Sequence, residues 1–196
     1  MEKVIQRVLL VTLLLICCQI TSAENNVEIN GLNYVLNNDG TASVGRNRNA
    51  VGDIVIPEFV EYDGNKYFVT ALSDESFSLC HDLRSVVLSN GITSLGDKSF
   101  YNCFNLISIA FPNSVISLGD SCFYACDDLT NIVLPNSVTS LGDDCFSGCS
   151  SLTDITLSEN IKSLGRGCFE SCTMLPKIVL PNSVTSLGDD CFRFCI

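Results

Sequence analysis

Phenylalanine returns every 23 residues along most of the chain, and the sequence around it repeats as well. The segment LTNIVLPNSVTSLGDDCFSGCSS, which begins at Leu129, is followed by LTDITLSENIKSLGRGCFESCTM, which begins at Leu152. A period of this length is typical of a solenoid, because one short unit cannot bury its apolar side alone and stacked units bury it together. We therefore expect six phenylalanines to form a continuous core: Phe77, Phe100, Phe123, Phe146, Phe169 and Phe192.

Each repeat predicts a strand, a second short strand, a turn and a helical turn. In the repeat that begins at Leu129, residues 132–134 alternate apolar side chains between two faces, as a strand with one buried face does. Pro135 should end this strand, because proline removes a hydrogen-bond donor from the ladder. Gly142 allows a turn that a side chain would obstruct. Residues 145–149 place two cysteines and a phenylalanine on one side of a single helical turn.

The complete repeat reads Leu-x-x-Ile-x-Leu-Pro, then Val-Thr-Ser-Leu-Gly, then Cys-Phe-x-x-Cys. Its first segment resembles the strand of a leucine-rich repeat, and the segments after it resemble the BspA-type branch of that family. The likeness recurs in register from about Ile54 to the last residue. Two columns depart from the family pattern, because Ser137 stands where an Asn or Cys is usual, and Cys145 where Ala is common. The Cys149 column is a candidate substitute for the missing side-chain ladder.

The period and the resemblance together predict a repeat solenoid. We expect a right-handed leucine-rich-repeat stack of short parallel strands and helical turns with an N-terminal β cap. The resemblance further implies a secreted or cell-surface microbial protein that attaches to host or neighbouring cells.

The chain divides into three predicted regions. Residues 1–23 have a basic start, an apolar run too short for a membrane span and a small-residue cleavage site, as in a signal peptide. Residues 24–71 form a β-hairpin cap with a degenerate first repeat, and residues 72–196 form the 23-residue repeats. No later apolar stretch is long enough for a membrane span, so we expect a secreted or extracellular cell-surface location.

The predicted cap contains two turns and an insertion. The sequence Asn-Asn-Asp-Gly at residues 37–40 indicates a hairpin. Nine residues are inserted between Pro57 and Val69 relative to the later repeats, with a second tight turn at residues 62–65. At the other end, the sequence stops at Ile196 inside a repeat. We therefore expect an uncapped edge that continues into a longer array or self-associates.

The negative charge of the chain disfavours binding to nucleic acid and anionic membranes. Without Lys3, Arg7 and Glu2, which belong to the predicted signal peptide, 9 basic and 21 acidic residues remain, a net charge of −12. Nucleic acid and anionic membranes require clustered Lys and Arg, so neither is an expected partner.

Aspartate recurs at one position of most repeats. We expect these carboxylates to cap the helical turns by accepting backbone N–H bonds. Calcium binding is the alternative, although a single file of carboxylates does not supply the six to eight converging oxygens that calcium needs. The column consists of Asp74, Asp97, Asp120, Asp143 and Asp189, with Arg166 before the last.

Ten cysteines follow the predicted signal peptide and occupy two repeating columns beside the phenylalanines. Free thiols packed as small apolar side chains are the favoured interpretation, and disulfides between column neighbours are the alternative for an exported chain. A zinc site is the weakest interpretation, because His81 is the only histidine. We predict no metal ion and no cofactor.

No catalytic constellation is recognisable, so we predict that the protein is not an enzyme. A nucleophile needs a base within hydrogen-bond reach, and His81 is the only imidazole. The leading hypothesis is a protein-binding module that recognises an extracellular or host-surface protein through the outward face of the repeat strands. The alternative is a structural element that stacks end to end. The predicted face consists of Arg84, Ser85, Val87, Ile107, Ser108, Thr130, Asn131, Val133, Thr153, Asp154, Thr156, Lys177 and Val179.

Overall fold

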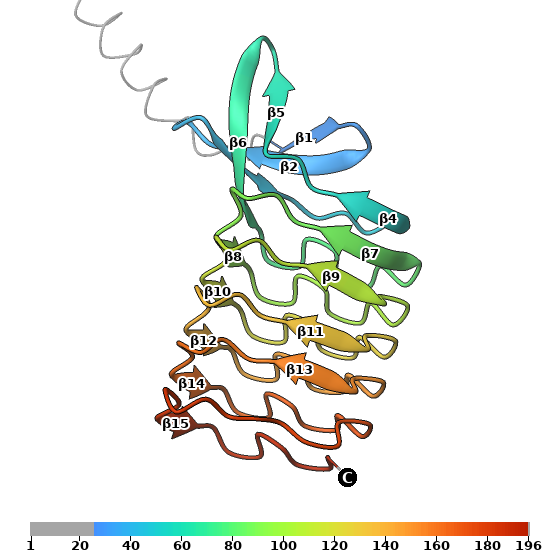
Figure 1. Cartoon of the computed structure of the whole chain (residues 1–196). Coiled ribbons are helices and arrows are strands. Elements are labelled where there is room, and N and C mark those ends of the chain that lie inside the picture. The colour runs from blue at the N-terminus through green and yellow to red at the C-terminus, as the bar shows by residue number, and fades with distance from the viewer. Residues whose placement is uncertain (1–25, 196) are drawn as a thin grey trace, which may run out of the picture.

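The computed structural model describes residues 26–195, so the predicted signal peptide, residues 1–23, lies outside the described part. The described residues form a β-solenoid, in which short strands from successive coils stack in parallel (Figure 1). The N-terminal strands are β1 (Asn26–Ile29), β2 (Leu32–Leu36), β3 (Thr41–Val44), β4 (Gly52–Val55), β5 (Phe59–Tyr62) and β6 (Asn65–Leu72).

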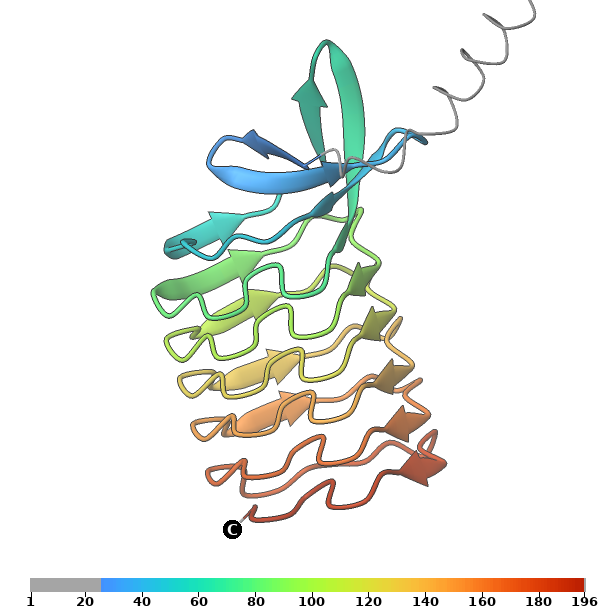
Figure 2. The ribbon, with the colours of Figure 1, turned by 180° about the vertical axis from the view of Figure 1, so that it is seen from behind.

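The repeats contribute two kinds of strand, which lie on different sides of the coil (Figures 1 and 2). The first kind consists of β7 (Leu83–Val87), β9 (Ser108–Ala110), β11 (Asn131–Val133) and β13 (Asp154–Thr156). The second kind consists of the two-residue strands β8 (Ser94–Leu95), β10 (Ser117–Leu118), β12 (Ser140–Leu141), β14 (Ser163–Leu164) and β15 (Ser186–Leu187).

Neighbouring repeats pair in register. Leu118 of β10 lies opposite Leu95 of β8 on one side and Leu141 of β12 on the other. In the first kind of strand, Ile132 of β11 pairs with Ile155 of β13. This register puts equivalent residues next to each other, so each apolar position of the repeat becomes a continuous column in the core.

The phenylalanine rings form the centre of this core. Five of the six are fully buried, from Phe77 to Phe169, and Phe192 in the last repeat is partly buried. Consecutive ring centroids lie 5.1 to 5.7 Å apart with interplanar angles of 9° or less. The rings therefore stack in one unbroken file along the axis.

The predicted helical turns are wrong, because residues 26–195 contain no helix. The segment around each phenylalanine is a series of tight turns. Two residues of each such segment adopt positive φ, and in the repeat of Phe146 these are Asp144 at 53° and Gly148 at 75°. A right-handed helix cannot continue through such residues. Their N–H groups instead donate to the next repeat, as Asp144 N does to Arg166 O at 2.7 Å and Gly148 N to Glu170 O at 2.8 Å.

The N-terminal strands extend the stack with antiparallel pairs. β2 and β3 form the hairpin predicted from residues 37–40, and β1 pairs with β2. β3 then pairs in parallel with β6, which also pairs with β8 of the first regular repeat. Strands β1–β3 thus lie at the N-terminal end of the array (Figure 1). That the array needs them as a cap stays a prediction.

The nine-residue insertion forms a second hairpin. β5 pairs only with the first half of β6, and the two are joined by Asp63 and Gly64, both with positive φ. This hairpin projects beyond the end of the stack (Figure 1).

Candidate binding surface

The outward side of the first kind of strand is a solvent-exposed face that spans two sheets, β4–β7–β9 and β11–β13. In β11 and β13 the central isoleucines, Ile132 and Ile155, are buried, whereas the residues on either side of each are exposed. Alternation of this kind follows from the strand period of two, which sends successive side chains to opposite faces. In the same way β7 buries Val86 and exposes Val87, so the outward positions of neighbouring strands join into one surface.

One column of this face is mainly apolar. Strand register places Val55 opposite Val87, Val87 opposite Ala110, and Val133 opposite Thr156. Val133 is 60% exposed and Val179 in the last repeat is 73% exposed. A row of solvated valines with no covering side chain is costly in water, and such exposed apolar patches commonly mark interaction sites.

The middle column of the face is polar. Ser85 donates a hydrogen bond to Asp53 Oδ1 at 2.6 Å, and Asn131 pairs in register with Asp154. In the column one residue earlier, Thr153 Oγ1 donates to the carbonyl oxygen of Thr130 at 3.1 Å and joins two neighbouring coils. The charges on the face are few and of both signs, so contact with a partner would depend on shape and apolar area more than on charge attraction.

The structure places the predicted face residues in the solvent. Twelve of the thirteen are exposed and Ser85 is half-buried. Lys177 and Val179 belong to no strand, because residues 174–181 form no ladder in the last repeat. Asp53 and Val55 of β4 were not among the predicted residues, and they extend the face toward the N-terminus. Their signal was present, since Val55 precedes Ile56 and Pro57 as Val133 precedes Leu134 and Pro135.

The aspartate column does not cap helices, because no helix is present in residues 26–195. Four of the five carboxylates, those of Asp74, Asp97, Asp120 and Asp143, instead accept the backbone N–H of the equivalent residue in the next repeat. Asp74 Oδ1 accepts from Asp97 N at 2.9 Å, and Asp120 Oδ1 accepts from Asp143 N at 2.8 Å. The same bond links Asp143 Oδ1 to Arg166 N at 2.7 Å. The column is therefore an inter-repeat hydrogen-bond ladder.

The cysteines are free thiols in the structure, and nine of the ten are buried. In the column of Cys149, every Sγ from Cys103 to Cys195 donates to a carbonyl oxygen 26 residues earlier, as Cys149 does to Phe123 O at 3.2 Å, whereas Cys80 donates to Asn47 O. This column thus supplies one side-chain ladder, and Ser137, which donates to Val115 O at 2.5 Å, supplies another. Burial raises the pKa of Cys103 and Cys172 to about 12, so these thiols stay protonated and weakly nucleophilic at neutral pH.

The only histidine packs against an aromatic ring. The ring centroids of His81 and Phe104 lie 4.2 Å apart at an interplanar angle of 17°. The neighbouring thiol of Cys80 has a pKa raised by desolvation, which opposes a role as a nucleophile. Across residues 26–195, no group of three or more His, Cys, Asp and Glu side chains is arranged to hold a metal ion.

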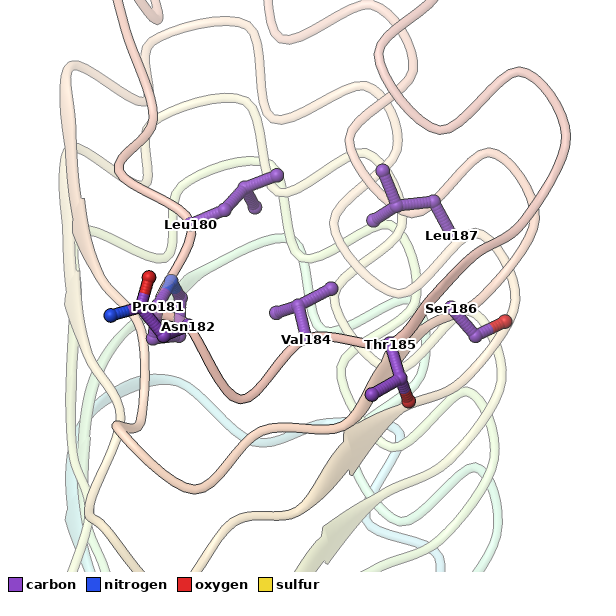
Figure 3. Close-up of a pocket in the computed structure, with 7 residues that line it drawn as sticks. All are labelled: Leu180, Pro181, Asn182, Val184, Thr185, Ser186 and Leu187. Carbon is purple, nitrogen blue, oxygen red and sulfur yellow. The ribbon is translucent and has the colours of Figure 1, made fainter.

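The last coil leaves its apolar interior open. Leu180, Val184 and Leu187 point toward one another across the inside of this coil (Figure 3). They line a hollow of about 580 Å³, and Leu187 is 47% exposed. The equivalent Leu141 is only 3% exposed, because the following coil lies on it.

Comparison with known proteins identifies the repeat. Six copies of the BspA type leucine rich repeat region match residues 70–196. The fold is similar to a leucine rich cell surface protein from Faecalibacterium prausnitzii A2-165, with 25% identity, a TM-score of 0.67 and coverage of 89% of this chain and 53% of that one. A leucine-rich repeat protein from Bacteroides ovatus is also similar, with 25% identity, a TM-score of 0.63 and coverage of 83% and 55%. A third, from T. pallidum, has 25% identity, a TM-score of 0.67 and coverage of 83% and 85%.

The chain thus spans about half the length of the first two of these proteins. No curated protein matches its sequence. In the part of the chain that the structure describes, no helix is long and apolar enough to cross a membrane.

Proposed function

Because the chain belongs to the BspA-type leucine-rich repeat family, we propose that it is a non-enzymatic extracellular protein-binding module. It recognises a protein of a host or neighbouring cell surface, or of the surrounding matrix, through the outward face of β4, β7, β9, β11 and β13. The similarity to a cell surface protein of Faecalibacterium prausnitzii supports an extracellular location. The predicted signal peptide at residues 1–23 supports the same location.

The observation that carries this proposal is the uncovered apolar column of the face. Val55, Val87 and Val133 project outward from β4, β7 and β11 and are each at least 45% exposed. The strands that hold them are fixed by inter-repeat hydrogen bonds, so the face is preorganised and a partner meets little ordering cost. The flat array of small side chains suits an extended protein surface better than a small molecule.

The test replaces apolar contact area on this face with charge. Val133→Asp and Thr156→Asp together should abolish adhesion to a panel of purified extracellular-matrix proteins and to intact cells. The matched control is Ile116→Asp, because Ile116 is 51% exposed but lies beside β10, on a different side of the coil. Circular dichroism should show an unchanged fold for both variants. Adhesion that survives the double substitution, or that is lost equally in the control, contradicts the face assignment.

The exposed apolar side chains of the last described coil favour a second candidate function, stacking of one chain on another. Exposed Leu180 and Leu187 would be covered by a further layer of the same geometry. Sedimentation velocity at increasing protein concentration tests this candidate, and Leu187→Lys should dissociate any assembly. A concentration-independent monomer rules it out.

A further inference from the structure

The projecting β5–β6 hairpin has two faces of different chemistry. On one face the ammonium of Lys66 lies 3.5 Å from the ring centroid of Phe59 and 5.0 Å from that of Phe68. These cation–π contacts, with the edge-to-face packing of the two rings at 6.5 Å, brace the hairpin on that face. The opposite face carries Tyr62 and Tyr67, which alternate with these residues along the strands.

The turn end of the hairpin and the N-terminal strands line two adjoining hollows, and Tyr62 and Tyr67 belong to their lining. One, of about 360 Å³, lies between the hairpin and β1–β2, and the other, of about 320 Å³, lies toward the β2–β3 turn. Asn65 and Tyr67 line both hollows, so the two adjoin where three hairpins meet, and together they are called the cleft below. The volume of each hollow falls at the lower end of the range of small-ligand sites, about 300–1,000 Å³.

The lining combines an apolar floor, aromatic faces and uncommitted polar groups. Val27 and Leu36 supply the floor, and Tyr62 and Tyr67 supply the aromatic faces. Within residues 26–195 no hydrogen-bond partner exists for the hydroxyl groups of either tyrosine or for the carboxylate of Asp63.

The amides extend this polar lining on the side of the second hollow. The side chain of Asn38 there likewise has no partner in the described chain. Asn65 donates to Asp63 O at 3.2 Å, which leaves its side-chain oxygen as an acceptor.

From this arrangement we propose that the cleft binds a neutral mono- or disaccharide. A sugar presents an apolar C–H face, which packs on an aromatic ring, and a rim of hydroxyl groups, each of which both donates and accepts hydrogen bonds. Amide and carboxylate side chains satisfy such a rim. The charged residues that line the cleft are Asp63 and Lys66, and the ammonium of Lys66 lies over the Phe59 ring on the other face of the hairpin, so the cleft offers no excess positive charge to a phosphate or sulfate group. The cleft shares no residue with the sheet face, so the glycan proposal can be tested independently of the proposed protein-binding face.

The experiment measures binding of the purified full chain to an array of neutral, sulfated and phosphorylated glycans, followed by calorimetric titration with lactose, maltose and cellobiose. Binding should be confined to neutral glycans. Tyr62→Ala should weaken it at least about tenfold, while Tyr62→Phe, which keeps the ring, should weaken it only about two- to threefold.

A control variant on the same hairpin distinguishes loss of a cleft contact from loss of the hairpin's structure. Phe68→Ala removes a ring of similar exposure, 54% against 46% for Tyr62, from the opposite face and should leave glycan binding unchanged. Melting temperatures of all variants establish that the fold is kept. The proposal is overturned if no neutral glycan binds, if only charged glycans or peptides bind, or if Phe68→Ala weakens binding as much as Tyr62→Ala.

Discussion

The glycine that follows the second strand is required at the scale of a single residue because neighbouring coils approach closely there. A Cβ atom on Gly142 would lie 2.5 Å from Asp120 Oδ1 and 2.7 Å from Asp120 N. The equivalent Gly165 is equally close to the backbone of residue 142, so the contact recurs along the stack. The sequence suggested that a turn requires glycine here. In the structure, glycine is required because a side chain would not fit between the two coils.

Gly142→Ala should therefore destabilise the array through overpacking, by about 1–3 kcal/mol in the free energy of unfolding. The added methyl group would also displace the carboxylate that joins Asp120 to the next coil. Urea denaturation followed by circular dichroism measures the effect. Thr139→Ala, three residues earlier on an exposed position, is the control and should change stability by less than about 0.5 kcal/mol. Equal losses in the two variants would mean that the coils can separate without cost.

The buried thiols give stability a dependence on pH. Desolvation raises the pKa of Cys103 and Cys172 to about 12 in the folded state, against an ordinary value near 8.5 in the unfolded chain. Above pH ~8.5 the unfolded chain loses these protons and the folded chain keeps them, so the folded state binds more protons. The contribution of these two thiols to the free energy of unfolding is thus fully present below pH ~8.5 and is lost as the pH rises toward about 12.

Each such thiol should add about 1.4 kcal/mol per pH unit to the fall of stability above its unfolded pKa. Denaturation of the reduced protein between pH 7 and 11 measures the slope. The double variant Cys103→Ala/Cys172→Ala should start from a lower stability at pH 7 but decline less steeply. An unchanged slope would show that other groups cause the loss at high pH.

At the scale of one element, the aspartate ladder supplies side-chain acceptors for backbone N–H groups of the neighbouring coil. Asp120 accepts the backbone N–H of Asp143, and its own N–H donates to Asp97 Oδ1 at 2.8 Å. The sequence pattern predicted that these oxygens accept backbone N–H bonds but assigned the donors to the wrong segment. An acidic residue before a turn is compatible with a helix cap and with a bond to the next coil. The close stacking of neighbouring coils favours the second arrangement.

Asp120→Ala should cost about 1 kcal/mol or more in the free energy of unfolding, because the N–H of Asp143 loses a charge-assisted acceptor. Asp120→Asn keeps an acceptor oxygen and removes one negative charge from a column of like charges, so it should recover most of the stability. Urea denaturation of both variants at low and moderate salt provides the measurement. A loss in Asp120→Asn as large as in Asp120→Ala would show that charge, and not the hydrogen bond, supports the ladder.

The turn segments show why part of the fold escaped prediction. The spacing of Cys145, Phe146 and Cys149 fits one side of a helical turn, and it fits a sequence of tight turns equally well. The difference lies in two residues with positive φ per repeat, and several of these positions hold Lys98, Ser121 or other non-glycine residues. Glycine occupies only two of these positions, Gly148 and Gly167, so the local sequence carried no consistent signal for the turns. The strands could be predicted because apolar and polar residues alternate along them and proline follows their ends.

At the scale of the whole molecule, the period determines the architecture but not the ligand. The 23-residue repeat requires the stack, and the exposed residues of the binding face follow from strand alternation. The glycan cleft follows from neither, because it is formed by an insertion and by antiparallel hairpins that occur once. Residues such as Tyr62 therefore have no repeat equivalent to reveal their position, and only the three-dimensional arrangement brings them together.

Stability in such a stack is expected to depend on position, because each coil contacts only its neighbours. The ring of Phe146 is fully buried and stacks on two others, at 5.2 Å and 5.5 Å, whereas Phe192 is partly buried and stacks on one, at 5.7 Å. Phe146→Ala should cost about 3–5 kcal/mol and open a cavity between two coils. Phe192→Ala should cost clearly less, because its environment is already partly solvated.

Hydrogen exchange resolved along the chain distinguishes local from global loss. In Phe146→Ala, amides of residues 152–195 should lose protection before those of residues 26–120, because the interface that joins the last coils to the rest is weakened. In Phe192→Ala only the last coil should exchange faster. Uniform loss of protection in both variants would mean that the chain unfolds as a single cooperative unit, which would contradict a core made of stacked, nearest-neighbour contacts.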